Sequence, residues 1–158
     1  MISIIAAVGK NLELGKNNDL IWHIKSDLKN FKELTMNKYI VMGTNTFNSL
    51  PKHLDGRKYI VLSHCIDSID DGIVFNNFTD LLEFINKTDE EVMIIGGASI
   101  YRLFLPYADN LYLTEIADEA DADVYFPAFD KSLYEKTVLK DCTTEDIPYQ
   151  LVEYKKKR

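Results

Sequence analysis

The sequence predicts an α/β fold in which helices cover a mainly parallel β-sheet, and two observations support this class. Short, fully apolar segments rich in β-branched residues alternate with helical patterns along most of the chain. Strands that are apolar on both faces are typical of parallel sheets buried between helix layers. The last quarter has two strand-like segments with no helix between them, which predicts an antiparallel hairpin. We therefore expect a single domain over residues 1–158 with about eight strands and about four helices.

The individual elements follow from these patterns. The strands are expected at 3–8, 39–42, 59–62, 92–95 and 111–116, and the hairpin at 134–141 and 149–156. The helices are expected at 25–36, 45–50, 79–86 and 98–105. Thr79 is the candidate N-cap of the third helix, which is amphipathic. The irregular segments 9–23 and 117–130 are better interpreted as functional loops than as domain boundaries.

The composition excludes several classes of protein. With 18 Lys and Arg against 25 Asp and Glu, the net charge is −7, which argues against binding to nucleic acid or to an anionic membrane surface. The N-terminal segment "ISIIAAV" lacks a basic start, so it indicates a buried strand rather than a signal peptide. Cys65, Cys142 and the three histidines show no metal-ligand spacing. We expect reduced thiols, no metal and a cytoplasmic protein.

Asp27 is the ionisable residue whose position looks costly. In its expected helix it lies within an arc of about 120° that also contains Leu28, Phe31, Leu34 and Thr35. An unpaired carboxylate removed from water costs several kcal/mol. Asp27 is therefore paired within the protein, neutralised, or kept for a ligand that supplies the missing donors.

Two glycine turns follow predicted strands and are compatible with phosphate. Gly43 precedes Thr44, Asn45 and Thr46, and the pair Gly96-Gly97 precedes the helix at 98–105. Each turn could present free backbone N–H groups at a helix N-terminus to an anion. Each could also be only a tight connection. The standard dinucleotide fingerprint and the P-loop are absent.

Taken together, these motifs resemble dihydrofolate reductase. The resemblance is carried by "ISIIAAV", the Leu14-Gly15 step, Trp22-His23 followed by Asp27-Leu28 and Phe31-Lys32, "IVMGTNTFNSL", "LDGRKYIVLS", "IIGGASIY", "LYLTEI" and "YFP". They occur in the order and spacing of that family over essentially the whole chain. The resemblance implies reduction of 7,8-dihydrofolate with NADPH as cofactor, in support of one-carbon metabolism.

The resemblance also implies a substrate site. Asp27 would pair with the amidine-like edge of the pterin, Thr114 would join that hydrogen-bond set, Trp22 would support the pterin through water, and Arg57 would bind the glutamate α-carboxylate. The catalytic residues would be Asp27, Trp22 and Thr114. The substrate-binding residues would be Ile5, Ala6, Ala7, Asp27, Leu28, Phe31, Lys32, Leu50, Lys52, Leu54, Arg57, Ile95, Tyr101 and Thr114.

For the cofactor, the resemblance implies that segment 9–23 closes over the nicotinamide and that the Gly96-Gly97 bond is cis. The cofactor-binding residues would be Ala7, Leu14, Gly15, Asn18, Asp19, Leu20, Gly43, Thr44, Asn45, Thr46, Leu62, Ser63, His64, Ile95, Gly96, Gly97, Ala98, Ser99, Ile100 and Tyr101.

This sequence departs from the family pattern at several positions. Ile21 and Lys25 replace two prolines, and Val124 replaces a threonine. Thr44 stands where arginine is common against the 2′-phosphate, so His64 becomes the nearest candidate cation for that group.

Other functions stay open at this stage. One alternative is a related pyrimidine reductase of riboflavin synthesis, and another is a pterin-binding or nucleotide-binding module without catalysis. We further expect that the protein is a monomer and that it binds antifolate inhibitors.

Overall fold

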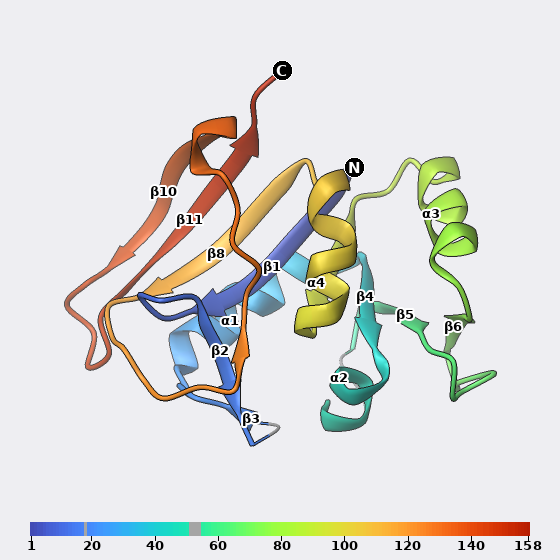
Figure 1. Cartoon of the computed structure of the whole chain (residues 1–158), viewed down its shortest axis with the longest axis horizontal. Coiled ribbons are helices and arrows are strands. Elements are labelled where there is room, and N and C mark those ends of the chain that lie inside the picture. The colour runs from blue at the N-terminus through green and yellow to red at the C-terminus, as the bar shows by residue number, and fades with distance from the viewer. Residues whose placement is uncertain (18, 51–54) are drawn as a thin grey trace.

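Helices and strands alternate along the chain as the sequence predicts, and Figure 1 shows their arrangement. The computed structural model describes residues 1–17, 19–50 and 55–158. The strands of the large sheet are β1 (Ile2–Val8), β4 (Tyr39–Gly43), β5 (Lys58–Leu62), β6 (Gly72–Phe75), β7 (Val92–Gly96), β8 (Asn110–Ile116), β10 (Tyr134–Cys142) and β11 (Tyr149–Lys156). The helices are α1 (Lys25–Thr35), α2 (Thr44–Ser49), α3 (Phe78–Lys87) and α4 (Ala98–Phe104), with 3₁₀ turns at Leu105–Tyr107 and Lys131–Leu133.

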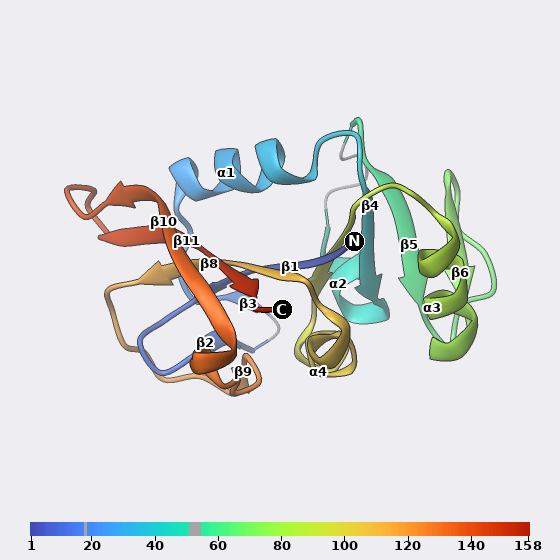
Figure 2. The ribbon, with the colours of Figure 1, turned by 90° about the horizontal axis from the view of Figure 1, so that it is seen from above.

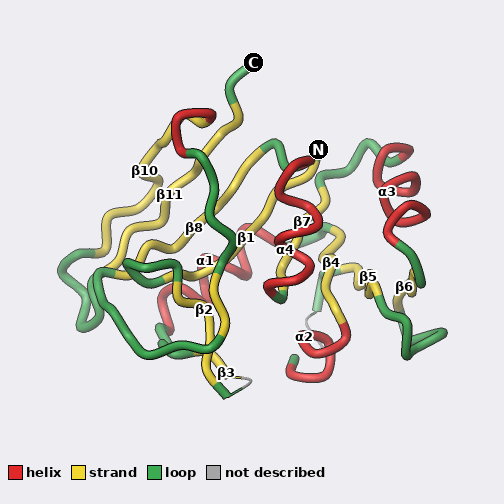
Figure 3. The backbone as a smooth tube through the Cα atoms, in the orientation of Figure 1, coloured by secondary structure: helices red, strands yellow, loops and turns green. Residues whose placement is uncertain are grey.

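The large sheet has the order β10-β11-β8-β1-β7-β4-β5-β6. All neighbours from β8 to β6 pair in parallel, whereas β11 is antiparallel to both β8 and β10. Figure 3 shows this hairpin beside β8. The predicted fold class, with its antiparallel C-terminal hairpin, is therefore confirmed. Because β1, β4 and β7 run in the same direction, their carboxyl ends meet at one edge of the sheet, where ligands bind in open α/β folds.

The core consists of two layers, one on each face of the sheet. In Figure 2, α1 lies on one side of the sheet, and α3 and α4 lie on the other. Alternate residues of β1 face the two sides: Ile4 belongs to the cluster that contains Phe104, and Ile5 belongs to the cluster against which Phe31 packs. Each such side chain contributes about 1.5 to 3 kcal/mol by burial. The double-sided burial explains why these strands are uniformly apolar in the sequence.

Four short strands were not predicted. β2 (Glu13–Lys16), β3 (Asp19–Leu20) and β9 (Val124–Tyr125) form a second sheet in the order β3-β2-β9, within the two segments that the sequence analysis treats as loops. β6 forms the far edge of the large sheet. These strands have two to four residues, so periodicity cannot reveal them, and β2 pairs with a strand more than a hundred residues away.

The buried face of α1 differs from the predicted one. Phe31 and Leu34 pack on the core and Thr35 is buried, as expected, but the side chain of Leu28 is 61% exposed. Asn30 is only 3% exposed and takes the place in the buried stripe that hydrophobicity assigned to Leu28. Periodicity could not place Asn30 in the interior, because the hydrogen-bond partners that compensate for its burial include residues from distant parts of the chain.

Other local details also differ from expectation. The N-cap of α3 is Asn77, whose side chain accepts a hydrogen bond of 2.9 Å from the backbone N–H of Asp80, so Thr79 lies inside the first turn. Cys65 and Cys142 are both unpaired. None of the described helices is long and apolar enough to cross a membrane.

Candidate active site

The centre of the site is a hydrogen bond between α1 and β8. Thr114, which is buried in β8, donates from Oγ1 to Oδ1 of Asp27 at 2.6 Å. Asp27 lies in the first turn of α1, where the helix dipole favours a negative charge. β8 pairs with β1 so that Thr114 lies opposite Ala7. The sequence-predicted residues Asp27, Thr114 and Ala7 are therefore brought together.

The electrostatics of Asp27 answer the question that its position raised. Burial raises the pKa of this carboxyl, while hydrogen bonds from Thr114 and Asn30 lower it, and burial prevails. Both of these bonds go to Oδ1, and within the described residues Oδ2 accepts no hydrogen bond. No lysine or arginine pairs with Asp27 among those residues. One oxygen is thus fixed by the protein and the other can accept from a ligand.

Asn30 is a site residue that the sequence analysis missed. Its Nδ2 donates to Oδ1 of Asp27 at 3.3 Å and to the hydroxyl of Tyr149 at 3.4 Å, and its Oδ1 accepts from Nζ of Lys140 at 2.8 Å. The one feature of the sequence that could have indicated this role is that Asn30 is a second polar residue, one turn after Asp27 and on the same side of the helix. Tyr149 and Lys140 gave no signal, because they lie on the hairpin.

A groove at the other end of α1 contains a half-buried cation, Arg57. Lys32, Met36, Asp55, Gly56 and Arg57 line a groove of about 460 Å³. The backbone N–H of Asn37 donates to the carbonyl of Gly56 at 2.6 Å, which holds the turn before Arg57 against the end of α1. The Nε and Nη1 atoms of Arg57 are buried and have no hydrogen-bond partner among the described residues. A guanidinium with unpaired buried donors suits a carboxylate ligand.

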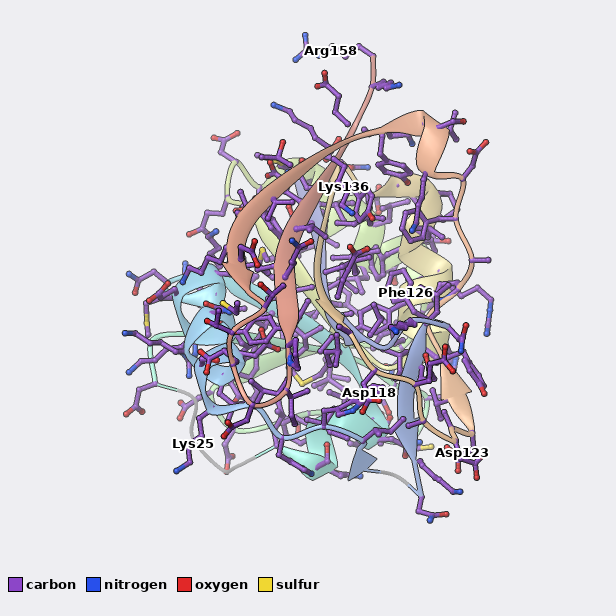
Figure 4. The ribbon with its side chains drawn as sticks, turned by 90° about the vertical axis from the view of Figure 1, so that its left-hand side faces the viewer. Lys25, Asp118, Asp123, Phe126, Lys136 and Arg158 are labelled. Carbon is purple, nitrogen blue, oxygen red and sulfur yellow. The ribbon has the colours of Figure 1, made fainter. Side chains whose placement is uncertain are left out.

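The two long segments that contain β2 and β9 are bound to each other. The indole N–H of Trp22 donates to Oδ2 of Asp118 at 2.9 Å, and this bond is the main reason why the pKa of Asp118 is lowered. The backbone N–H of Asn17 donates to Asp123 at 3.0 Å. Figure 4 shows Asp118 and Asp123 on the chain segment that runs past β2. Because Trp22 has one donor and Asp118 accepts it, the role of Trp22 in holding the pterin through water stays a prediction.

Glu13 is the buried group in this loop pair. It is 1% exposed, and its carboxylate accepts from the backbone N–H groups of Asn11 at 2.6 Å and Ala120 at 2.8 Å. A Cβ atom on Gly9 would lie 2.5 Å from the Trp22 ring and 2.6 Å from Glu13, so a larger residue there would have to displace one of these side chains. The sequence analysis assigned no role to either residue.

The predicted glycine turns meet at the carboxyl edge of the sheet. Gly43 and Gly97 are the N-caps of α2 and α4, and neither helix has a side-chain cap. A Cβ atom on Gly97 would lie 3.7 Å from Oγ1 of Thr46, so the two helix N-termini lie side by side. The Gly96-Gly97 peptide bond is cis, as the resemblance implies, and Gly96 has φ +122°. This arrangement leaves uncapped N–H groups and little side-chain bulk, which fits a pyrophosphate.

Ser63 connects this edge to β5. Its Oγ lies 2.7 Å from Oγ1 of Thr44 and accepts from the backbone N–H groups of Cys65 and Ile66 at 3.0 and 3.2 Å. Asn76, which the sequence analysis missed, donates to the carbonyl of Ser63 at 2.7 Å. His64 is exposed beside this hydroxyl pair. Thr44 and Ser63 are thus brought together as predicted.

The remaining predicted residues divide into three groups. Ile5, Ala6, Ile100 and Tyr101 are buried, and the hydroxyl of Tyr101 lies 2.8 Å from the carbonyl oxygens of both Ile5 and Ile95. Leu14 and Gly15 lie in β2, and Leu20 in β3 is 54% exposed. Predictions for Asn18, Lys52, Leu54 and the side chain of Asp19 lie outside the described residues.

Comparisons with known proteins agree on one family. The family model described as dihydrofolate reductase matches residues 1–156. Dihydrofolate reductase of Bacillus subtilis (strain 168) is 41% identical over 162 residues, which cover 99% of this chain and 95% of the relative. The enzyme of Buchnera aphidicola subsp. Acyrthosiphon pisum is 40% identical, with 92% and 90% covered. The solved structure of dihydrofolate reductase from Enterococcus faecalis, complexed with NADP(H) and RAB-propyl, superposes with a TM-score of 0.89 at 28% identity and covers 100% of this chain and 97% of that chain.

Proposed function

Because the chain belongs to the dihydrofolate reductase family, we propose that dihydrofolate binds between α1 and β8 against Asp27, and NADPH at the glycine turns after β4 and β7. The chain is an NADPH-dependent oxidoreductase that reduces 7,8-dihydrofolate to 5,6,7,8-tetrahydrofolate by hydride transfer. One observation carries the substrate site: Asp27 has one oxygen fixed by Thr114 and the other open to a ligand.

Asp27 orients the pterin and manages its proton. The open Oδ2 accepts from the N–H groups on the amidine-like edge of the ring, while Thr114 keeps the carboxylate from rotating. Reduction of the C=N bond places a hydride on carbon and a proton on nitrogen. Burial raises the pKa of Asp27, which makes the carboxylate a better acceptor for a proton shared with the pterin, and a protonated C=N bond accepts hydride more readily.

The residues of the two glycine turns fit the cofactor. NADPH, when bound, supplies the hydride. The uncapped N-termini of α2 and α4 would hold the pyrophosphate through their free backbone N–H groups. A larger side chain at Gly43 would crowd Ile100, and one at Gly96 would crowd Tyr101. Thr44, Ser63 and His64 would hold the 2′-phosphate through hydroxyl, imidazole and backbone groups.

The groove beside Arg57 would take the glutamate end of the substrate. A guanidinium presents parallel N–H donors that match the two oxygens of an α-carboxylate, and the buried Nε and Nη1 atoms of Arg57 have no partner in the described structure. Lys32, on the same groove, adds a second positive charge. These two cations attract an anionic substrate to a protein whose net charge is −7.

The test is the loss of NADPH absorbance when dihydrofolate is added, compared with the pyrimidine substrate of the related riboflavin-pathway enzyme. Turnover with dihydrofolate alone, strongly reduced at neutral pH in Asp27→Asn, supports the proposal. Turnover with the pyrimidine would reveal the related reductase, and turnover with neither would leave a pterin-binding module. Neither alternative is favoured by the family match.

Several finer features are part of this proposal. The product supports one-carbon metabolism and the synthesis of thymidylate, purines and amino acids, and antifolate inhibitors compete for the pterin site. The protein works in the cytoplasm, in keeping with its two unpaired cysteines, and as a monomer. It binds no nucleic acid, in keeping with its negative charge.

A further inference from the structure

Asn30 is a buried amide whose orientation is fixed from outside the helix. An amide has one acceptor atom and one donor group with two hydrogens. Nζ of Lys140 has only donors and lies 2.8 Å from Oδ1 of Asn30, so the amide nitrogen must point the other way. There it meets two acceptors, Oδ1 of Asp27 and the hydroxyl of Tyr149. A flipped amide would face the ammonium group with its own donors.

A β-bulge brings Lys140 to this position. Val138 pairs with Val152 and Lys140 pairs with Leu151, so Leu139 is an extra residue on β10. Leu151 in turn lies opposite Thr114. Directly paired residues present their side chains on the same face of the sheet, so the bulge puts Lys140 in one row with Thr114. Without the extra residue, Lys140 would face the other side.

We propose that Asn30, oriented by Lys140, is a positioning residue that holds the Asp27 carboxylate in its ionised form and so sets the pH range of the reduction. The proposal rests on the proposed function of Asp27. Asn30 touches neither the reacting carbon nor the cofactor in this scheme and acts only through Asp27. Lys140 also forms an ion pair with Glu33 at 3.2 Å, but both side chains are exposed, so this pair contributes little to stability in water. The effect of Lys140 on the site is therefore expected to come from its hydrogen bond to Asn30.

The groups that face Asp27 come from several elements. They are Asn30 on α1 and Thr114 on β8, with Ala7 of β1 adjacent to Thr114. Behind Asn30 lie Lys140 of β10 and Tyr149 of β11, whose hydroxyl also lies 2.6 Å from Oγ of Ser26 and contacts Cys142. Burial raises the pKa of Tyr149, so this hydroxyl stays protonated in the working range.

Removing the amide donor therefore makes the carboxylate more basic. The hydrogen bond from Asn30 opposes the effect of burial on the pKa of Asp27. The midpoint at which the reduction slows with rising pH belongs jointly to Asp27 and the bound pterin, and a more basic carboxylate raises it. Loss of Asn30 should thus extend activity to higher pH, which a merely structural role would not do.

The experiment measures the single-turnover rate of NADPH oxidation with saturating dihydrofolate from about pH 5 to about pH 9. We compare the parent with Asn30→Leu, Lys140→Met and Lys140→Arg. The matched control is Lys136→Met: Lys136 lies on the same strand, is 46% exposed against 44% for Lys140, and pairs with Glu115. Figure 4 shows Lys136 in the upper part of the hairpin, away from Lys25 at the start of α1.

We expect the midpoint of the pH profile to move to higher pH in Asn30→Leu. At pH values above this midpoint, the rate of the variant, divided by its own low-pH plateau, should be about three times the corresponding ratio of the parent. Lys140→Met should move the midpoint in the same direction by less, and it keeps the test available if Asn30→Leu does not fold. Lys140→Arg, which keeps the donors, and Lys136→Met should match the parent.

Three results would overturn the inference. An unchanged midpoint in Asn30→Leu and Lys140→Met, while Asp27→Asn loses activity, refutes the role of Asn30 alone. An equal shift in Lys136→Met shows a general charge effect instead of positioning. Retention of parental rates in Asp27→Asn would refute the proposed function itself, and the inference with it.

Discussion

Replacement of Arg57 by leucine is a direct test of the substrate groove. The guanidinium carries two buried nitrogens with no partner in the described residues, and it lines the groove together with Lys32. If it receives the glutamate α-carboxylate, the resulting pair is bidentate and largely removed from water. Leucine keeps much of the apolar volume and removes every donor.

The expected loss follows from this desolvation. Truncating one partner of a buried, hydrogen-bonded charge pair costs about 2 to 5 kcal/mol, which corresponds to a roughly 30-fold to several-thousand-fold rise in Kd for dihydrofolate. An exposed pair would lose only about 0 to 1 kcal/mol. Because the buried nitrogens of Arg57 have no described partner, Arg57→Leu should not lower the melting temperature of the free protein.

The assay is calorimetric titration of Arg57→Leu and of the parent with dihydrofolate, with NADPH, and with a dihydropterin fragment that lacks the glutamate tail. We expect a large loss for dihydrofolate and none for NADPH or the fragment. The matched control is Lys32→Met, which changes an exposed cation of the same groove and should cost no more than about 1 kcal/mol. Equal losses for the fragment and for dihydrofolate would show that Arg57 shapes the pocket and does not bind the carboxylate.

Further outcomes are expected for four substitutions. Asp27→Asn should lower kcat/KM more than about 100-fold at neutral pH. Burial raises the pKa of Asp27 in the folded protein, so the stabilisation from this group is complete below the ordinary pKa of 3.8 and is lost as pH rises through the raised pKa. Asp27→Asn should therefore have a higher melting temperature than the parent at neutral pH and no higher one in acid, which calorimetry will show. Glu13→Gln should cost about 1 to 3 kcal/mol in denaturant unfolding at neutral pH. Burial raises the pKa of Glu13, the backbone N–H groups of Ala120 and Asn11 lower it, and the lowering prevails. The stabilisation from Glu13 is complete above the ordinary pKa of 4.5 and disappears as pH falls through the lowered pKa. A loss of stability in Glu13→Gln that persisted in strong acid would contradict this role. Thr44→Arg should raise the ratio of NADPH to NADH affinity about ten-fold, and His64→Gln should lower it; an unchanged ratio in both would place the 2′-phosphate elsewhere.

The sequence by itself determined the fold class and pointed to the residues of the candidate site. Uniform apolar strands, helical periodicity between them and the change of pattern after residue 130 predict the sheet and its hairpin, because each signal reflects the average environment of a local segment. The same reasoning found Asp27, since a carboxylate among apolar neighbours conflicts with its surroundings. The glycine turns at Gly43 and Gly96-Gly97 were visible for the same reason.

Only the tertiary structure decided which groups complete the site. Asn30 and Lys140 are 110 residues apart, and their contact depends on the strand order and on one extra residue in β10. Trp22 and Asp118 are 96 residues apart, and they meet because β2 pairs with the distant β9. A hydrogen-bond partner is fixed by register, and a shift of one residue turns a strand's side chains to the opposite face without changing the composition of the segment. For this reason the pattern of residues predicts the layers of the fold but not the partners across them.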